Sequence, residues 1–267
     1  MDIAAADFAV EDDFEPVERI DGRLDAGALV ICDHARNAFP RAYGTLGLSP
    51  EAIERHIAYD IGAAWLTRRL AARLEAPALL STFSRLLIDP NRGANDPTLV
   101  MRYSDGAIVP GNARVDEAEI DRRRRLYWSP YRDAVHAMTE AMLATAEPPA
   151  LISVHSFTPV WRGWVRPWRI GALWDDDPRL TRALLAALEQ DGLAPHEIGD
   201  NEPYSGGLKG DTIDAVAKPR GLANVLIEVR QDLIATKEAA EAWGDRLARL
   251  LAPLLREGVR QPRKAQV

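Results

Sequence analysis

The sequence predicts an α/β fold in which a mainly parallel sheet is covered by helices on both faces. Short, almost wholly apolar runs recur along the chain, which is typical of strands buried on both faces. Amphipathic stretches of helical period separate these runs, and helical connections are what parallel strands require. With 267 residues, 47% of them hydrophobic and 27% charged, we expect one three-layer α/β/α domain over residues 1–267. Its core spans about 24–258, and both termini, roughly 1–23 and 261–267, are peripheral.

The first strand is predicted at Ala28–Cys32, a short run of apolar residues. A long helix is predicted to begin after Ser49, because serine is a favoured N-cap residue and Pro50 is favoured at the first helical position. Apolar residues then recur at helical spacing from Ile53 to Leu70, so we expect the helix to continue through them.

The next apolar runs, Ala78–Thr82 and Leu86–Ile88, are predicted strands. Residues 89–112 are rich in Pro, Gly, Asn and Asp, and a loop of this length inside a domain is usually functional. Residues 116–146 have a helical pattern, with a break expected near Ser129 because proline follows it.

Two more strands and two more helices complete the predicted alternation. Ala150–Val154 and Asn224–Val229 are apolar runs and are predicted strands. Pro178–Asp191 and Lys237–Leu255 are predicted helices. Between them, Trp161–Trp174 is rich in aromatic residues and is expected to form turns or strands that pack as core or lid.

Composition excludes several classes of protein. The chain has 33 basic and 40 acidic residues, a net charge of −7, which disfavours nucleic acid as a partner. The basic run Arg122–Arg125 follows acidic residues in a helical segment and is interpreted as a solvated helix face. Cys32 is the only cysteine, so no intramolecular disulfide is possible. Residues 1–15 lack signal-peptide features and no run of about 18 apolar residues exists, so we expect a cytoplasmic protein without a membrane partner.

Polar side chains follow three of the predicted strands. His34 comes just after the first strand, His155 after the strand at 150–154, and Glu228 after the apolar run that begins at Asn224. Ligands of parallel α/β sheets bind at the carboxyl ends of the strands. A catalytic zinc needs about three His, Asp or Glu ligands and an open position for water. We therefore predict a metal bound by His34 and His155, with Glu228 as general base.

The third metal ligand has two candidates in the sequence. Asp60 is preferred, because a carboxylate oxygen is a better ligand than an amide, and Asn37 is the second choice. His56 lies four residues before Asp60. It is either a half-exposed partner of Asp60 or a catalytic residue that orients the site.

Arginines frame the start of the long loop. Arg85 and Arg92 flank the run Leu86–Ile88, and Asn91 lies beside them. Arginine suits a bidentate grip on a carboxylate. These three residues are therefore predicted to bind an anionic substrate.

The polar motifs together resemble the N-formylglutamate amidohydrolase family. They occur in the family's order and cover roughly residues 29–255. The matching stretches are Cys32–Asn37 followed by Pro40, His56–Gly62, Ser84–Arg92, Ser153–Phe157 and Ile227–Arg230. Ala35, Arg36 and Asn37 stand where better-known members have small residues, so the chain resembles a divergent branch.

The resemblance implies a zinc-carboxypeptidase-like fold, metal on His34 and His155, and Arg92 in the substrate pocket. The implied reaction is hydrolysis of an N-acyl, preferably N-formyl, amide of an acidic amino acid. Zn²⁺, or another divalent metal, would activate the attacking water, Glu228 would move its proton to the leaving amine, and Ser156 and Asn37 would add hydrogen bonds. The alternatives are an amidase or peptidase acting on larger, cell-wall-type peptides and a noncatalytic metal-binding protein. The sequence leaves the oligomeric state open.

Overall fold

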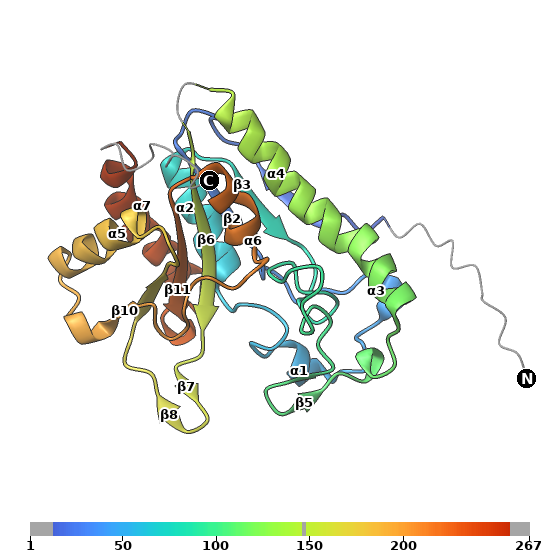
Figure 1. The fold of residues 1–267 in the computed structure, drawn as a ribbon. Helices are drawn as coiled ribbons and strands as arrows, with labels where there is room; N and C mark the ends of the chain where they lie inside the picture. The colour runs from blue at the N-terminus through green and yellow to red at the C-terminus, as the bar shows by residue number, and fades with distance from the viewer. Residues whose placement is uncertain (1–12, 146–147, 257–267) are drawn as a thin grey trace, which may run out of the picture.

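The computed structural model describes residues 13–145 and 148–256, and their main feature is a seven-stranded sheet (Figure 1). Its strand order is β1-β3-β2-β6-β11-β9-β10. In that order the strands are Val17–Ile20, Ala78–Ser81, Ala28–Cys32, Ala150–Phe157, Asn224–Arg230, Ile170–Leu173 and Ile198–Asp200. The four central strands β3, β2, β6 and β11 are parallel, whereas β1 and β9 pair antiparallel with β3 and β11. The predicted mainly parallel, mixed sheet is confirmed.

Helices cover both faces of this sheet, as the alternation of its side chains requires. Ile152 and Val154 of β6 and alternate residues of β11 belong to the apolar core on one face, together with three helices: α2 (Ala63–Leu74), α5 (Arg179–Gln190) and α7 (Lys237–Arg256). Leu151, one residue away, packs in the core on the other face. That face is covered by α4 (Ser129–Leu143) and α6 (Thr212–Val216). The three-layer α/β/α arrangement is therefore confirmed.

The long helix predicted after Ser49 is wrong in its middle part. Ser49 does cap a helix, but α1 ends at Ile53 (Pro50–Ile53), and turns follow until α2 begins at Ala63. Gly62 precedes α2 with φ +81°, and a Cβ there would lie 2.1 Å from the carbonyl oxygen of Ile234. The apolar residues of this stretch are buried in turns, which gives them the same spacing as a helix. Asp60 consequently lies in a turn directly before α2.

The strand predicted at Leu86–Ile88 is also wrong, because these residues form a buried turn. The carbonyls of Leu86 and Leu87 accept from side chains and not from a neighbouring strand. The Asn112 amide donates to the carbonyl of Leu86, and the Arg123 guanidinium donates to the carbonyl of Leu87. Arg123 is only 2% exposed, so the interpretation of the basic run as a solvated helix face is wrong at that residue.

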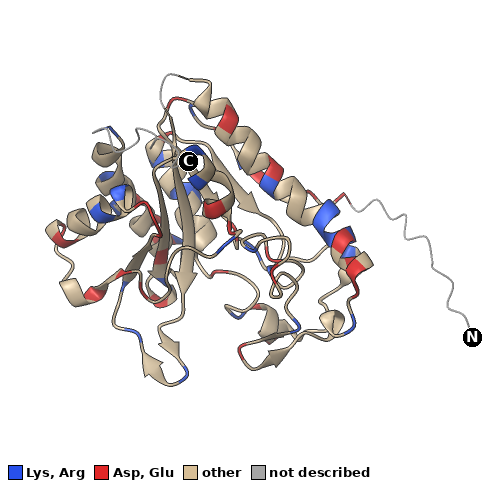
Figure 2. Cartoon of the chain, in the orientation of Figure 1, with Lys and Arg blue, Asp and Glu red and all other residues tan. Residues whose placement is uncertain are grey.

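The helical segment predicted at 116–146 contains α3 (Glu117–Arg123) and α4, joined by a π-helical segment at Arg124–Trp128. The expected break near Ser129 therefore exists as a change of helix type. Both signs of charge alternate along α3 and α4 (Figure 2), and Glu119 pairs with Arg123 on the first of them.

Several elements were not predicted. β1 forms an edge of the sheet, although it lies within residues 1–23, which were expected to be peripheral. The C-terminal part expected to be peripheral, from residue 261 onward, lies outside the described residues. β10 and α6 were missed as well. Two hairpins lie outside the main sheet. One pairs β4 (Tyr103–Ser104) with β5 (Ala107–Ile108) in the loop after residue 89, and the other pairs β7 (Val160–Trp161) with β8 (Trp164–Val165) just after β6. The remaining short 3-10 helices are Arg41–Tyr43, Pro110–Asn112, Pro195–Glu197, Lys218–Arg220 and Gln231–Leu233. Among the described helices, none has the length and apolar character needed to cross a membrane.

Candidate metal centre

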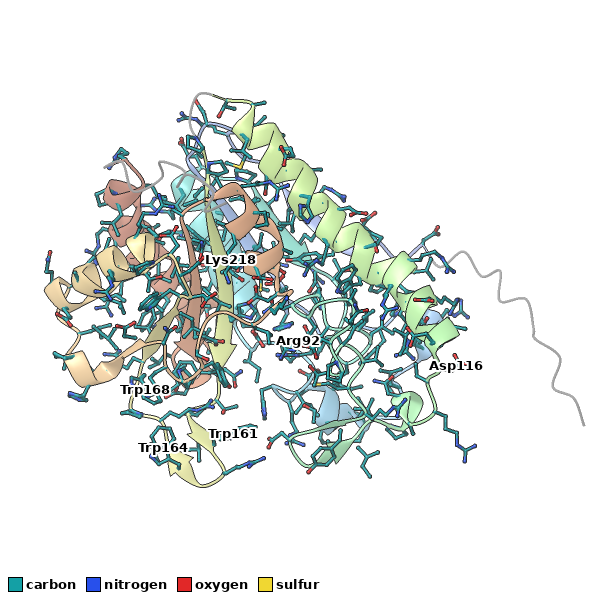
Figure 3. The ribbon with its side chains drawn as sticks, in the orientation of Figure 1. Arg92, Asp116, Trp161, Trp164, Trp168 and Lys218 are labelled. Atoms are coloured by element: carbon teal, nitrogen blue, oxygen red, sulfur yellow. The ribbon has the colours of Figure 1, made fainter. Side chains whose placement is uncertain are left out.

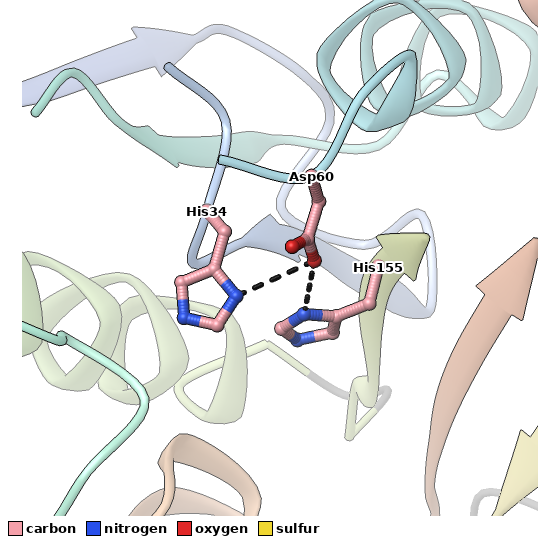
Figure 4. Close-up of side chains that lie close together, drawn as sticks. All are labelled: His34, Asp60 and His155. Atoms are coloured by element: carbon pink, nitrogen blue, oxygen red, sulfur yellow. Dashed lines mark hydrogen bonds and ion pairs between the residues drawn. The ribbon is translucent and has the colours of Figure 1, made fainter. Parts of the chain in front are cut away.

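Three buried side chains meet at the carboxyl ends of the central strands (Figure 4). His34 follows β2, His155 lies near the end of β6, and Asp60 comes from the turn before α2. Asp60 Oδ2 is 2.8 Å from His155 Nδ1 and 3.3 Å from His34 Nδ1. One possible ligand atom from each residue lies within 4.8 Å of the other two. The turn after α1 thus brings Asp60, the preferred third ligand, to the two histidines.

Each histidine is also bonded on the far side of its ring. His34 Nε2 lies 2.8 Å from Asp89 Oδ1, and His155 Nε2 lies 3.0 Å from Ser153 Oγ and 3.3 Å from Asp33 Oδ2. To bind a metal through Nδ1, each ring would carry its proton on Nε2, where the carboxylates of Asp89 and Asp33 accept it. Both Nδ1 atoms lie on the side of Asp60. Two imidazoles and one carboxylate oriented in this way fit a divalent metal ion.

The carboxylates of Asp89 and Asp33, which lie behind the two histidines, are both kept ionised by their neighbours. Burial by itself would raise the pKa of Asp89, but Arg85 and His34 hold it well below its usual value. Asp33 is fully buried and accepts hydrogen bonds from Ser153 Oγ at 3.0 Å and Thr212 Oγ1 at 2.7 Å. Both outer carboxylates therefore stay ionised and can fix the rings of the histidines.

Asp89→Asn is expected to weaken metal binding about 10- to 100-fold, the range seen when a carboxylate behind a histidine ligand is lost. An amide oxygen still accepts from His34 Nε2, but it lacks the charge that makes the imidazole a stronger ligand. Titration of the metal-free protein with zinc measures the change. Asp96→Asn is the matched control, since Asp96 lies in the same loop and accepts from exposed Thr98. Equal affinities of both variants would contradict this role.

Glu228 lies in β11 directly beside His155 of β6 in the register of the sheet. It is 6% exposed, and its Oε2 has no hydrogen-bond partner among the described residues. Burial raises its pKa to about 8, although the nearby His155 acts in the opposite direction. Glu228 lines a cavity of about 530 Å³ together with His34, Asp60 and His155. A buried carboxylate with a free oxygen in such a cavity is able to take up a proton.

The two predicted arginines behave differently. Arg85 donates to Asp89 Oδ2 at 2.7 and 3.1 Å, and its third nitrogen lies 3.6 Å from Asp60 Oδ1. Its charge therefore supports the carboxylates of the centre. Arg92 donates to Thr98 Oγ1 and to its neighbour's carbonyl, and no carboxylate in the described part of the chain pairs with it. Both line the cavity, and of the two only Arg92 (Figure 3) forms no salt bridge with a described residue, although its charge helps to hold the pKa of Asp89 low.

Asn91 and Ser156 line the cavity as well, with side chains engaged in the frame of the site. Asn91 Oδ1 accepts from the backbone N–H of Thr212, which is the first residue of α6. The backbone N–H of Ser156 lies 3.3 Å from Asp60 Oδ2, and its hydroxyl donates to the carbonyl of Ile61. Ser156 thus orients Asp60.

Asn37 does not join the centre. Its amide donates to the carbonyl of Ile53 and to Glu54 Oε1, and it lines a different cavity. The residue lies just past the carboxyl end of β2, where the chain has turned toward α1. The structure therefore places Asn37 away from the proposed third-ligand position and from the substrate cavity.

His56 lines the cavity but lies outside the group of three ligands. Its Nε2 is 3.2 Å from Asp105 Oδ2 at the tip of the β4–β5 hairpin, and its ring packs edge-on against Trp161. Burial lowers the pKa of His56. The expected pairing with Asp60 at helical spacing is not found, because the chain between them forms turns.

Sequence reasoning missed two groups of residues. Asp33 and Asp89 bond to the far side of the two histidine rings, whereas Arg166 and Tyr204 form a wall on another side of the site. Asp33 and Asp89 had a signal, since both stand in the polar motifs beside His34 and Arg92. Arg166 and Tyr204 had none. Arg166 is 3% exposed, and its guanidinium donates to the Tyr204 hydroxyl at 3.3 Å across a sequence distance of 38 residues.

Comparisons with known proteins agree with this architecture. A gene product of Agrobacterium tumefaciens of known structure is 34% identical, with a TM-score of 0.84, and the match covers 91% of this chain and 96% of that one. The N-formylglutamate amidohydrolase of Ralstonia eutropha JMP134 has the same fold at 20% identity and a TM-score of 0.71, covering 92% of this chain and all of that one. No curated protein matches the sequence.

The family model described as N-formylglutamate amidohydrolase matches residues 26–235. This span contains every residue of the candidate centre, from His34 to Glu228, and makes up most of the chain. The expected resemblance is thereby confirmed: the chain belongs to the N-formylglutamate amidohydrolase family.

Proposed function

We propose that the protein is a metal-dependent amidohydrolase that cleaves the N-acyl amide bond of a small N-acyl amino acid. N-formyl derivatives of acidic amino acids, such as N-formylglutamate, are the first substrates to test. The family is one of enzymes that hydrolyse amide bonds. The observation that carries the proposal is the free oxygen of buried Glu228 in the same cavity as the His34, Asp60 and His155 cluster.

His34, Asp60 and His155 would hold the metal ion, for which zinc is our first choice. When bound, a divalent metal supplies Lewis-acid chemistry, since it polarises the scissile carbonyl and makes water more acidic. Glu228 accepts a proton from the attacking water as the new C–O bond forms. It then gives this proton to the departing nitrogen as the C–N bond breaks, which releases the free amine.

Other residues of the cavity would position the substrate. Arg92, which forms no salt bridge with a described residue, would hold the substrate carboxylate, while Arg85 stays bound to Asp89. The cavity volume of about 530 Å³ lies in the usual range of small-molecule sites, which supports a small substrate over a long peptide. Three protein ligands, compared with the four of a structural zinc site, support catalysis over metal storage.

The Arg92→Lys variant is expected to raise KM about tenfold or more with a smaller effect on kcat. Lysine keeps the charge but cannot form the two parallel hydrogen bonds that arginine makes to a carboxylate. Steady-state kinetics with N-formylglutamate measures this, and the corresponding α-carboxamide should be a poor substrate of the parent enzyme. Arg102→Lys is the control, because Arg102 belongs to the same loop but donates to the carbonyl of Val115 outside the cavity. Equal turnover of acid and amide would exclude the role.

The proposed function as a whole is tested with metal-loaded protein and a panel of N-formyl, N-acetyl and N-succinyl amino acids. We expect release of free amino acid that depends on the metal. Failure to hydrolyse any member of the panel, with metal bound at full stoichiometry, would overturn the proposal.

A further inference from the structure

The cavity has a polar side and an apolar side, separated by the candidate metal ligands. Arg92 lies beyond β2, near the helical layer of α3 and α4, since its carbonyl accepts a hydrogen bond from Trp128 Nε1 at 3.1 Å. From there the strand order leads through His34 after β2 and His155 in β6 to β11 and β9. In Figure 3, Arg92 lies to the right of β6, and Trp168, which comes just before β9, lies to its left.

The floor of the cavity on the β9 side is made of two leucines. Leu226 stands two residues before Glu228 in β11 and so points to the same face of the sheet. Its cross-strand partner is Leu173 of β9, and both leucines line the cavity. Leu173 is 3% exposed and Leu226 is half-buried, so together they present an apolar surface just beyond Glu228.

The opposite wall comes from residues 201–211, which run from β10 across this face to α6 and contribute Tyr204 and Leu208 to the lining. The segment rests directly on the sheet, because a Cβ at Gly171 would lie 2.0 Å from the carbonyl oxygen of Glu202. Tyr204 is held in place by Arg166.

The guanidinium of Arg166 lies within 5.5 Å of three aromatic rings and donates to the Tyr204 hydroxyl. The rings belong to Phe157, Trp161 and Tyr204. Arg166 is itself buried, which makes this wall a fixed part of the fold. Leu208 is 39% exposed and Tyr204 45%, so apolar surface remains at the mouth for a ligand to cover.

We infer that this apolar side is an acyl subsite, and that the enzyme takes N-acyl amino acids whose acyl group is an apolar chain larger than formyl; the inference rests on the proposed function. In such a substrate the scissile carbon lies between the carboxylate and the acyl chain. With the carboxylate on Arg92 and the scissile bond at the metal ligands, the chain extends over Leu226 and Leu173. A formyl group carries only hydrogen and would leave the accessible surface of Leu226 uncovered.

The charges of the cavity support an apolar chain at this end. Arg85 is bound to Asp89 and close to Asp60, so among the described lining residues Arg92 alone has an arginine charge free for a carboxylate. A second carboxylate on the β9 side would lie between leucines and beside Glu228. Arg166 is the cation behind this wall, but its guanidinium donates to Thr158 and Tyr204 and does not line the cavity. Burying a carboxylate there without a partner is unfavourable, whereas burying methylene groups is favourable.

The test uses metal-loaded protein and the series N-formyl-, N-acetyl-, N-butanoyl- and N-hexanoylglycine, in which the amino acid has no side chain. We expect kcat/KM to rise about fourfold for each methylene buried, until the leucine surface is covered. The ratio of hexanoyl to formyl turnover should collapse in Leu226→Ala. The ratio should persist in Leu185→Ala, which removes a partly buried leucine of α5 that packs against the core.

Two results would overturn the inference while leaving the proposed function intact. One is a decrease in kcat/KM from the formyl to the longer acyl compounds. The other is a gain from N-formylglycine to N-formylleucine with no gain from N-acetyl to N-hexanoylglycine, since the apolar wall would then bind the amino-acid side chain. Turnover of none of these compounds by an enzyme that hydrolyses N-formylglutamate would overturn the inference alone, and failure of this series and of the N-formyl, N-acetyl and N-succinyl panel would overturn both.

Discussion

Replacing Glu228 by glutamine is expected to lower kcat at least about 100-fold, the lower end of what a positioned proton-transfer group contributes. Glutamine keeps the size and shape of the side chain but cannot accept the proton of the attacking water. Because Glu228 is not among the three candidate ligands, the variant should bind metal at the parent stoichiometry and substrate with little change in KM. Steady-state kinetics on metal-loaded protein, with metal content determined in parallel, gives both quantities.

The pH profile adds an independent readout of the same residue. Burial raises the pKa of Glu228 to about 8, and only its carboxylate form accepts a proton. Activity of the parent should therefore fall as pH is lowered through this pKa, and the limb should be lost in Glu228→Gln. Glu140→Gln is the control, since Glu140 is an exposed residue of α4 that forms a salt bridge with Arg220. If Glu228→Gln kept its metal and its kcat was unchanged, another residue would have to be the general base, and His56 would be the first candidate.

Loss of either histidine of the centre should abolish both metal binding and activity. In His155→Ala and His34→Ala only one imidazole and Asp60 remain, too few ligands to hold a catalytic metal. The fold should persist, because both side chains stand at strand ends and the apolar cores do not depend on them. Metal analysis after dialysis, with circular dichroism for folding, measures the outcome. Added zinc should restore the chelator-treated parent but neither variant.

The control is His136→Ala, which removes a half-buried histidine of α4 that accepts from Arg220, far from the ligands. Burial opposes protonation of His155, but hydrogen bonds to Asp33 and Asp60 raise its pKa to about 10. A metal ion must displace this proton, so apparent metal affinity of the parent should fall as pH is lowered. Full zinc stoichiometry in both single variants would contradict the ligand assignment.

The parts of the fold that the sequence could predict are those governed by local pattern. β2, β6 and β11 lie in the middle of the sheet with a helical layer on each face, so each contains a run of mostly apolar residues. Parallel strands align their carboxyl ends, and this alone brought His34, His155 and Glu228 to one edge. By contrast, the turn that carries Asp60 has the apolar spacing of a helix, and the buried turn Leu86–Ile88 has the composition of a strand.

The unpredicted parts of the site depend on contacts between distant segments. Arg166 and Tyr204 meet through the folding of 201–211 over the sheet, and Leu226 meets Leu173 through an antiparallel pairing at its edge. Asn37 has suitable chemistry and spacing, but the direction of the chain after β2 carries it toward Glu54. Residue type and separation do not report such directions.

The centre draws its parts from almost the full length of the chain, and this ties the metal to folding. Asp33, behind one histidine, bonds to Thr212, which is 179 positions away. Closing a loop of that size has an entropic cost that no local contact repays, so the centre exists only once the parallel strands have assembled. A metal that binds this state and not the unfolded chain adds its binding free energy to the stability of the native protein. Metal supply would then determine how long the protein persists as well as whether it is active.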